Sequence, residues 1–215
     1  MPQRLNILKS WKAFVLLIAG VPLAAYGIVR FAEDRYGRLP YFAPNNERTG
    51  SAEDAPGLGE FSFRDADGKL TESKEWKGSI TIAHFFFTSC PMICPLMMSN
   101  MKTIQSGAGD ARLISVTVDP AHDTPENLRG YIRRTGFGEG SWQLLTGDKR
   151  ELYRFARKGL FVTATEGDGG PEDFIHSDRL VLLDQNLRIR GYYSGISGKE
   201  VQLLLDDLKK LQHER

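Results

Sequence analysis

A chain of 215 residues, 41% of them hydrophobic, is long enough for one globular domain with some additional sequence, and its core does not depend on disulfides. Its formal net charge is +1, with 28 Lys and Arg against 27 Asp and Glu. This balance, with no basic stripe along the chain, gives no electrostatic basis for binding nucleic acid.

The N-terminal segment predicts a membrane anchor. Residues 13–29, "AFVLLIAGVPLAAYGIV", form an uncharged run that is preceded by Lys12 and followed by Arg30. At about 1.5 Å per residue, such a run just crosses a hydrocarbon core of about 30 Å. Positive charge before the run predicts residues 1–12 in the cytoplasm, a transmembrane signal anchor at 13–30, and the bulk of the chain outside. A cleaved signal peptide is the alternative, because "PLAA" offers small residues for cleavage.

The next segment, residues 31–57, mixes charges, glycine and proline without an apolar period, which predicts a linker before a domain at 58–215. The domain opens with "FSFRDADGKL" (61–70), two short alternating segments around a glycine turn, which indicate a β-hairpin. The segment "SITIAHFFF" (79–87) is too apolar for a half-exposed strand. We expect it to be a central strand that is covered on both faces.

The remaining domain alternates strands and helices. Pro95 suits a first helical turn, which predicts a helix over about 94–105. Further on, Asp123 or Thr124 can cap a helix that has Pro125 near its first position. The other expected elements are a strand at 111–119, a helix near 148–158, a glycine- and acid-rich loop at 165–174, a hairpin of 179–184 and 187–193, and a closing amphipathic helix at 198–212. This order predicts an α/β protein with a thioredoxin-like fold, a central mixed sheet flanked by helices with an N-terminal hairpin.

The two cysteines, Cys90 and Cys94, are four residues apart directly after the expected central strand. Three uses are open: a structural disulfide, a redox dithiol and a soft-metal clamp. A disulfide closing so short a loop would contribute only about 2 kcal/mol in the chain-entropy model. A thiol at a helix N-terminus meets unpaired N–H groups and the positive end of the helix dipole. Both favour the thiolate, which is the form that attacks disulfides and binds metals.

Two sulfurs leave a metal site short of a third ligand, and the chain has four histidines. His84, inside the central strand, is expected to be packed in the core, and His213, in the tail, is expected to be solvated. His122 belongs to a turn and can assist the cap of the following helix. His176 comes directly before the strand at 179–184 and is either an ordinary loop residue or the third ligand.

Three blocks, "FFFTSCPMICPLM", "VTVDPAHDTPENLRGY" and "HSDRLVLLD", closely resemble the signature blocks of the Sco/SenC family, over roughly residues 58–212. Members of that family are membrane-tethered thioredoxin-fold proteins that bind one copper through two cysteines and a distal histidine. They assist assembly of the binuclear copper-A centre of cytochrome c oxidase. The resemblance implies that Cys90, Cys94 and His176 bind one copper per chain. It also implies that Asp119 lies near the site, behind the ligands or as a docking group.

The same resemblance implies a place and partners for the protein. It indicates the bacterial inner membrane, with the soluble domain facing the periplasm. The implied partners are the copper-A subunit of cytochrome c oxidase and periplasmic copper donors or thiol reductants.

The ligand chemistry agrees with copper, because two thiolates hold Cu(I) and an imidazole is also acceptable to Cu(II). Met92, Met97, Met98 and Met101 invite a methionine-rich copper site. Their clustering on one expected helix is more simply explained by core packing, and only Met92, in the loop, could approach the metal.

Other functions use the same two thiols. A thiol–disulfide oxidoreductase needs Cys90 and Cys94 as a redox pair but no histidine. Against it, the chain lacks a proline directly before "RLVLLD", where thioredoxins carry a cis-proline. A peroxidase is disfavoured, because "FFFTS" precedes the cysteine in place of the Pro-x-x-x-Thr pattern of peroxiredoxins. A copper- or redox-responsive signalling protein remains open. Copper binding and thiol reduction can also both hold, because a reduced dithiol must exist before copper binds.

Overall fold

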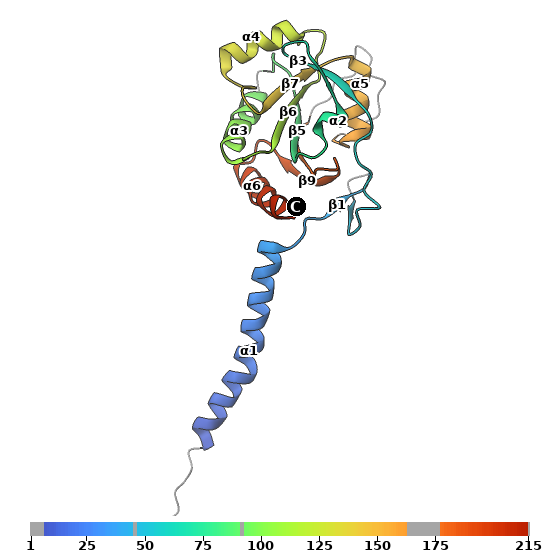
Figure 1. The fold of residues 1–215 in the computed structure, drawn as a ribbon. Coiled ribbons are helices and arrows are strands. Elements are labelled where there is room, and N and C mark those ends of the chain that lie inside the picture. Colours follow the sequence, from blue (N-terminus) through green and yellow to red (C-terminus); the bar gives the residue numbers. More distant parts are fainter. Residues whose placement is uncertain (1–6, 45–46, 91–92, 163–176, 215) are drawn as a thin grey trace, which may run out of the picture. The chain divides into compact units, whose positions relative to one another are not determined.

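The computed structural model describes residues 7–44, 47–90, 93–162 and 177–214. The chain divides into two compact units, Met1–Arg38 and Leu39–Arg215, which are described separately. In the first unit, helix α1 (Ile7–Tyr36) contains the whole uncharged run and includes Pro22 (Figure 1). In the part of the chain that the structure describes, no helix presents a stretch both long enough and apolar enough to cross a membrane. The membrane anchor stays a prediction.

The second unit is built on a seven-stranded sheet with the order β4-β3-β7-β6-β5-β8-β9. Strands β5, β6 and β7 run parallel to one another, whereas the pairs β3–β4, β3–β7, β5–β8 and β8–β9 are antiparallel, so the expected mixed sheet is confirmed. The strands are β3 (Ser62–Asp65), β4 (Leu70–Glu72), β5 (Thr81–Phe86), β6 (Arg112–Thr117), β7 (Trp142–Thr146), β8 (Arg179–Leu183) and β9 (Ile189–Ser194), and β1 (Tyr41–Phe42) pairs separately with β2 (Arg48–Thr49).

Helices cover both faces of this sheet. All six residues of β5 are buried, and alternate ones face opposite sides: Ile82 belongs to one hydrophobic cluster and Ala83 to the other. The first cluster takes side chains from α3 (Ile93–Gly107) and α6 (Gly198–His213). The second takes them from α2 (Ser73–Trp76), α5 (Lys149–Arg154) and the π-helical turn at Phe155–Gly159. The prediction of a central strand covered on both faces is confirmed.

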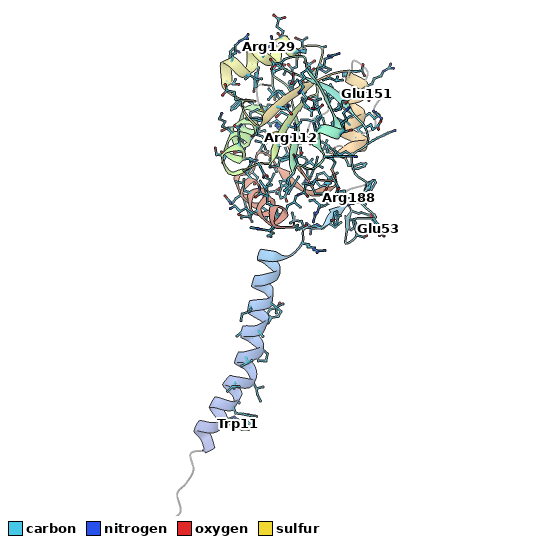
Figure 2. The ribbon with its side chains drawn as sticks, in the orientation of Figure 1. Trp11, Glu53, Arg112, Arg129, Glu151 and Arg188 are labelled. Atoms are coloured by element: carbon cyan, nitrogen blue, oxygen red, sulfur yellow. The ribbon has the colours of Figure 1, made fainter. Side chains whose placement is uncertain are left out.

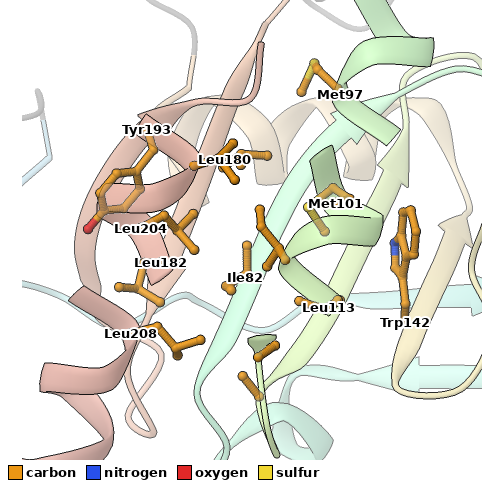
Figure 3. Close-up of a cluster of buried hydrophobic side chains, with 14 of the residues drawn as sticks. Ile82, Met97, Met101, Leu113, Trp142, Leu180, Leu182, Tyr193, Leu204 and Leu208 are labelled. Atoms are coloured by element: carbon orange, nitrogen blue, oxygen red, sulfur yellow. The ribbon is translucent and has the colours of Figure 1, made fainter. Parts of the chain in front are cut away.

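The methionines of α3 belong to the core. Met97, Met98 and Met101 have no exposed surface, and Figure 3 shows Met97 and Met101 beside the buried leucines and isoleucine of the sheet. A flexible thioether fills the irregular space between a helix and a sheet without needing a polar partner. Core packing is therefore the correct interpretation of these three residues, while Met92 lies outside the described residues.

The local signals for turns and caps also hold. The β3–β4 hairpin turns through Gly68 at φ 77°, a conformation that favours glycine. Helix α4 (Pro125–Thr135) begins after Thr124, whose side chain accepts the backbone N–H of Asn127 at 3.3 Å, with Pro125 in the first turn. Thr124 is thus the cap, and the carboxylate of Asp123 is left for another partner.

Residues 39–57 differ from the expected linker, because the second unit begins at Leu39 and not near residue 58. Arg190 is 3% exposed and donates to the carbonyl oxygens of Leu39 at 2.6 Å and Pro40 at 3.2 Å. It also pairs with Glu214 at 2.7 Å and lies over the ring of Tyr41, 4.1 Å from its centroid. A buried guanidinium needs these acceptors, so it holds the start of the unit in place.

Side-chain hydrogen bonds also connect α2 to the sheet, at the first residue of β6. Arg112, labelled in Figure 2, stands at the first position of β6. Its guanidinium donates to the carbonyl oxygen of Glu75 in α2 at 2.9 Å and to the side chain of Gln143 in β7 at 3.2 Å. One arginine therefore links a short helix to two strands.

Candidate metal and redox site

The two cysteines lie at the C-terminal end of β5. The backbone N–H of Cys90 donates to the carbonyl oxygen of Phe87 at 3.3 Å, in the turn that follows the strand. Cys94 is the second residue of α3, which begins at Ile93, close to the start predicted from Pro95. Neither cysteine is in a disulfide; Cys90 is half-buried and Cys94 is 5% exposed. The C-terminal end of a parallel strand is the usual place for a site in α/β proteins.

A small pocket contains both cysteines. Its lining is mostly apolar and comprises Phe85, Phe86, Phe87, Cys90, Ile93, Cys94, Val118 and Ser177. Its volume of about 30 Å³ has room for an ion or a water molecule but not for an organic ligand.

Ser177 reaches this pocket because of the sheet topology. Strand β8 is antiparallel to β5 and pairs Leu180 with His84, so the residues before β8 arrive at the end of the sheet where the cysteines lie. His176 is the chain neighbour of Ser177 and lies outside the described residues.

Burial controls the charge state of Cys94. The pKa of this thiol is raised to about 12, mainly by burial; a hydrogen bond with the Phe87 backbone opposes the rise, and Cys90 and Asp123 contribute smaller increases. Desolvation therefore outweighs the helix N-terminus, which alone was expected to favour the thiolate. At neutral pH this thiol keeps its proton, and a soft metal ion that binds here has to displace it.

Within the described ranges, no three His, Cys, Asp or Glu side chains converge to hold a metal ion. The structure thus brings together two of the three expected ligands, and the third lies in the part of the chain it does not describe. Two soft thiols in an apolar pocket suit a thiophilic ion or a dithiol–disulfide couple, and they do not suit a hard cation such as Mg²⁺.

The other three histidines differ in burial and in their contacts. His84 is fully buried, with its Nε2 2.5 Å from the hydroxyl of Ser115 and its Nδ1 3.2 Å from the Phe85 carbonyl oxygen. Burial lowers its pKa to about 4, which confirms the expected core histidine. His122 is exposed, and its Nδ1 lies 2.9 Å from Oδ1 of Asp123. His213 is exposed at the end of α6.

Two aspartates differ in their relation to the cysteines. Asp119 is half-buried, and its carbonyl oxygen closes a turn by accepting the backbone N–H groups of Asp123 at 2.8 Å and His122 at 3.2 Å. Asp123 is fully buried, and its carboxylate accepts hydrogen bonds from Thr88, two residues before Cys90. Sequence reasoning treated Asp123 only as a possible helix cap and missed this contact, which spans 35 residues of chain.

Tyr131 of α4 is a further neighbour of the site that the sequence did not indicate. Its pKa is raised to about 12, mainly by burial, with smaller contributions from Cys94, Asp123 and Cys90 and an opposing one from Arg134. Its ring lies 6.1 Å from that of Phe86, centroid to centroid. The only local signal was its place on an amphipathic helix, which does not say which pocket the side chain approaches.

Known proteins resemble this chain over most of its length. A family model described as SCO1/SenC matches residues 49–212. The crystal structure of a SCO1/SenC family lipoprotein from Bacillus anthracis is 34% identical, with a TM-score of 0.63, over 73% of this chain and 95% of that one. A structure reported for a disulfide switch in BsSco, a member of the Sco family of cytochrome c oxidase assembly proteins, is 26% identical, with a TM-score of 0.63, over 75% and 96%. Yeast Sco1 with copper bound is 28% identical, with a TM-score of 0.54, over 72% and 90%.

Proposed function

Because this chain belongs to the SCO1/SenC family, we propose that it binds one copper ion through Cys90, Cys94 and His176 and assists assembly of the copper-A centre of cytochrome c oxidase. The observation that carries the proposal is the small pocket in which both cysteines meet Ser177, the neighbour of His176. The copper-bound yeast relative and the oxidase-assembly relative support the choice of metal and of partner.

The donor set fits copper on chemical grounds. Two thiolates bind Cu(I) strongly, and an imidazole completes a nitrogen–sulfur set that Cu(II) accepts. The apolar lining of the pocket keeps water from competing for the ion, while only three protein ligands leave it open to the ligands of an incoming partner. Such a site suits an ion that is handed on to another protein.

A thiol–disulfide oxidoreductase is the second candidate, and one observation favours it. Cys90 and Cys94 are both in the reduced state, with no disulfide between them, and their side chains are within hydrogen-bonding reach of each other. In this function Cys90, which is the more exposed thiol, would attack a disulfide, since burial holds the proton on Cys94. The related BsSco was described with a disulfide switch, which agrees with a dithiol at this position.

Copper titration of the reduced protein separates these functions. Cys90→Ser or Cys94→Ser removes one of two soft ligands and should nearly abolish stable binding of either oxidation state. His176→Ala should lose Cu(II), together with its sulfur-to-copper charge-transfer absorption, but should keep much of its Cu(I). His213→Ala, which changes an exposed histidine at the end of α6, is the matched control and should bind as wild type does.

The opposite result also has a clear meaning. Equal Cu(II) binding by wild type and His176→Ala would remove His176 from the site. Weak copper binding throughout, with reduction of a disulfide substrate that depends on Cys90 and not on His176, would establish the oxidoreductase.

The location of the protein is part of the proposal. The uncharged run at 13–29 and the positive charges before it support a signal anchor in the bacterial inner membrane, with the copper-binding unit in the periplasm. The described side chains of α1 add to this, because the large apolar ones between Trp11 and Val29 are exposed.

A reporter fused after residue 59 tests this location. It should be active outside the cytoplasm and should remain in the membrane fraction. Activity in the cytosol would refute the topology, whereas release of a shortened soluble product would show a cleaved signal peptide.

A further inference from the structure

One buried carboxylate joins the cysteine loop to the neighbouring strand. Asp123 has no exposed surface, and hydrogen-bond donors surround it. Its Oδ2 accepts the backbone N–H of Thr88 at 3.0 Å and the hydroxyl of Thr117 at 2.6 Å. Its Oδ1 accepts the hydroxyl of Thr88 and lies 2.9 Å from Nδ1 of His122. A buried carboxylate is tolerated only with such a complete set of donors.

Two of these donors lie close in sequence to Cys90 or at the end of the neighbouring strand. Thr88 stands two residues before Cys90, between β5 and α3, and Thr117 is the last residue of β6. Asp123 therefore fixes the start of the cysteine loop against the end of the adjacent strand. This task is separate from capping α4, which Thr124 performs.

The charge of Asp123 acts on the same site. Cu(I) with two thiolates and a neutral imidazole carries one net negative charge, whereas Cu(II) with the same ligands is neutral. A carboxylate nearby in a medium of low dielectric repels the negatively charged state more strongly. It therefore favours Cu(II).

We infer that Asp123 is a positioning residue for copper, which holds the Cys90 loop in the arrangement Cu(II) requires and whose negative charge favours Cu(II) over Cu(I). The inference rests on the proposed function. Cu(I) is satisfied by two thiolates in varied arrangements, so Cu(II) depends more on the fixed loop. Groups that support metal ligands from behind typically change metal affinity by about 10- to 100-fold.

Asp123→Asn tests both parts of this role in the full-length protein. The amide keeps the shape of the side chain, loses its charge and has one oxygen with which to accept bonds that two oxygens share now. We expect the Kd for Cu(II) to rise about 10- to 100-fold and the Kd for Cu(I) to change much less. Competition with a Cu(II) chelator and, under anaerobic conditions, with a Cu(I) chelator measures the two constants.

A pair of substitutions at Thr88 tests the hydrogen bonds that position the Cys90 loop separately from the charge of Asp123. The same pair tests the positioning role if Asp123→Asn does not fold. Thr88→Val removes the hydroxyl that donates to Asp123 and should weaken Cu(II) binding in the same direction. Thr88→Ser keeps the hydroxyl and should restore the wild-type affinity. Equal Cu(II) affinities for the valine and serine variants would refute the role of the Thr88–Asp123 hydrogen bond in Cu(II) binding.

Asp184→Asn is the matched control. Asp184 is 4% exposed and accepts the backbone N–H groups of Asn186 at 2.9 Å and Arg188 at 3.0 Å, in the β8–β9 hairpin at the other end of the sheet. Its substitution should lower stability and leave the ratio of the two copper constants unchanged. The same shift of that ratio in Asp184→Asn and Asp123→Asn would overturn the inference.

Hydrogen exchange of the copper-free protein gives a readout that does not depend on the metal. The N–H of Thr88 should exchange at least about tenfold faster in Asp123→Asn than in wild type, because its acceptor is weakened. Wild-type protein that binds no copper would refute the proposed function alone. An unchanged exchange rate at Thr88 would refute the positioning role even if copper binds.

Discussion

Acid should destabilise the globular unit through His84, well above the pH at which most carboxylates titrate. The imidazole is fully buried in β5 and takes part in a chain of hydrogen bonds. The indole N–H of Trp142 donates to the hydroxyl of Ser115 at 2.8 Å, and that hydroxyl lies 2.5 Å from Nε2 of His84. Because the Ser115 hydroxyl receives one bond and donates the other, Nε2 is an acceptor and the ring is neutral, with its proton on Nδ1 towards the Phe85 carbonyl.

The size of the effect follows from the two pKa values of His84. Its ordinary value is 6.5, which applies to the unfolded chain, and burial lowers the pKa to about 4 in the folded protein. The unfolded state therefore binds the proton more readily, so stability is complete above pH 6.5 and falls as the pH drops towards 4. At about 1.4 kcal/mol per pH unit, the whole loss is about 3 kcal/mol, and about 2 kcal/mol of it is present by pH 5.

Urea unfolding of residues 37–215, followed by tryptophan fluorescence between pH 7.5 and 5, measures this loss. His84→Gln removes the titrating group and keeps a polar side chain for Ser115, so its free energy of unfolding should change by about 2 kcal/mol less over that range. Identical pH dependence in wild type and His84→Gln would refute the reasoning, because the proton would then bind elsewhere.

Substitutions at three further positions test the fold. Arg190→Met should lower the free energy of unfolding by about 3–5 kcal/mol in urea titrations, because it leaves the acceptors of this buried guanidinium, the buried carboxylate of Asp184 among them, without this partner; a loss below 1 kcal/mol would contradict the role given to Arg190. Gly138→Ala should cost about 2 kcal/mol or more in the same assay, since φ is +85° there and a Cβ would lie 2.3 Å from a methyl group of Leu144. Thr124→Ala should cost about 1 kcal/mol through loss of the α4 cap, while Thr124→Ser should cost much less.

The parts of the fold that could be predicted from sequence depend on neighbours along the chain. The largely apolar segment before the cysteines identified β5 as a buried central strand, and Thr124 with Pro125 marked the start of α4. A hairpin such as β8–β9 follows from two apolar segments around a short polar turn. These signals lie within short stretches of sequence, and the tertiary contacts of the folded unit stabilise the same elements.

What could not be predicted depends on contacts across long stretches of sequence. Asp123 accepts a hydrogen bond from Thr88, 35 residues away in sequence, and Arg190 donates one to Leu39, 151 residues away. No local sequence pattern predicts either contact. The raised pKa of Cys94 also results from contacts between residues that are distant in sequence. Its position at a helix start was predictable, but the packing that removes water from it is a property of the assembled unit.

The bonds between Leu39, Arg190 and Glu214 have a practical consequence for the geometry of the globular unit. Leu39 donates its backbone N–H to Glu214 at 2.8 Å, so the chain enters the unit beside its last described residue, near the start of β9 (Figure 1). The cysteine pocket lies at the opposite end of the sheet, past the length of β5, roughly 20 Å away. A support or a tag joined to this unit at Leu39 or after Glu214 is therefore attached at the end of the sheet opposite the two thiols.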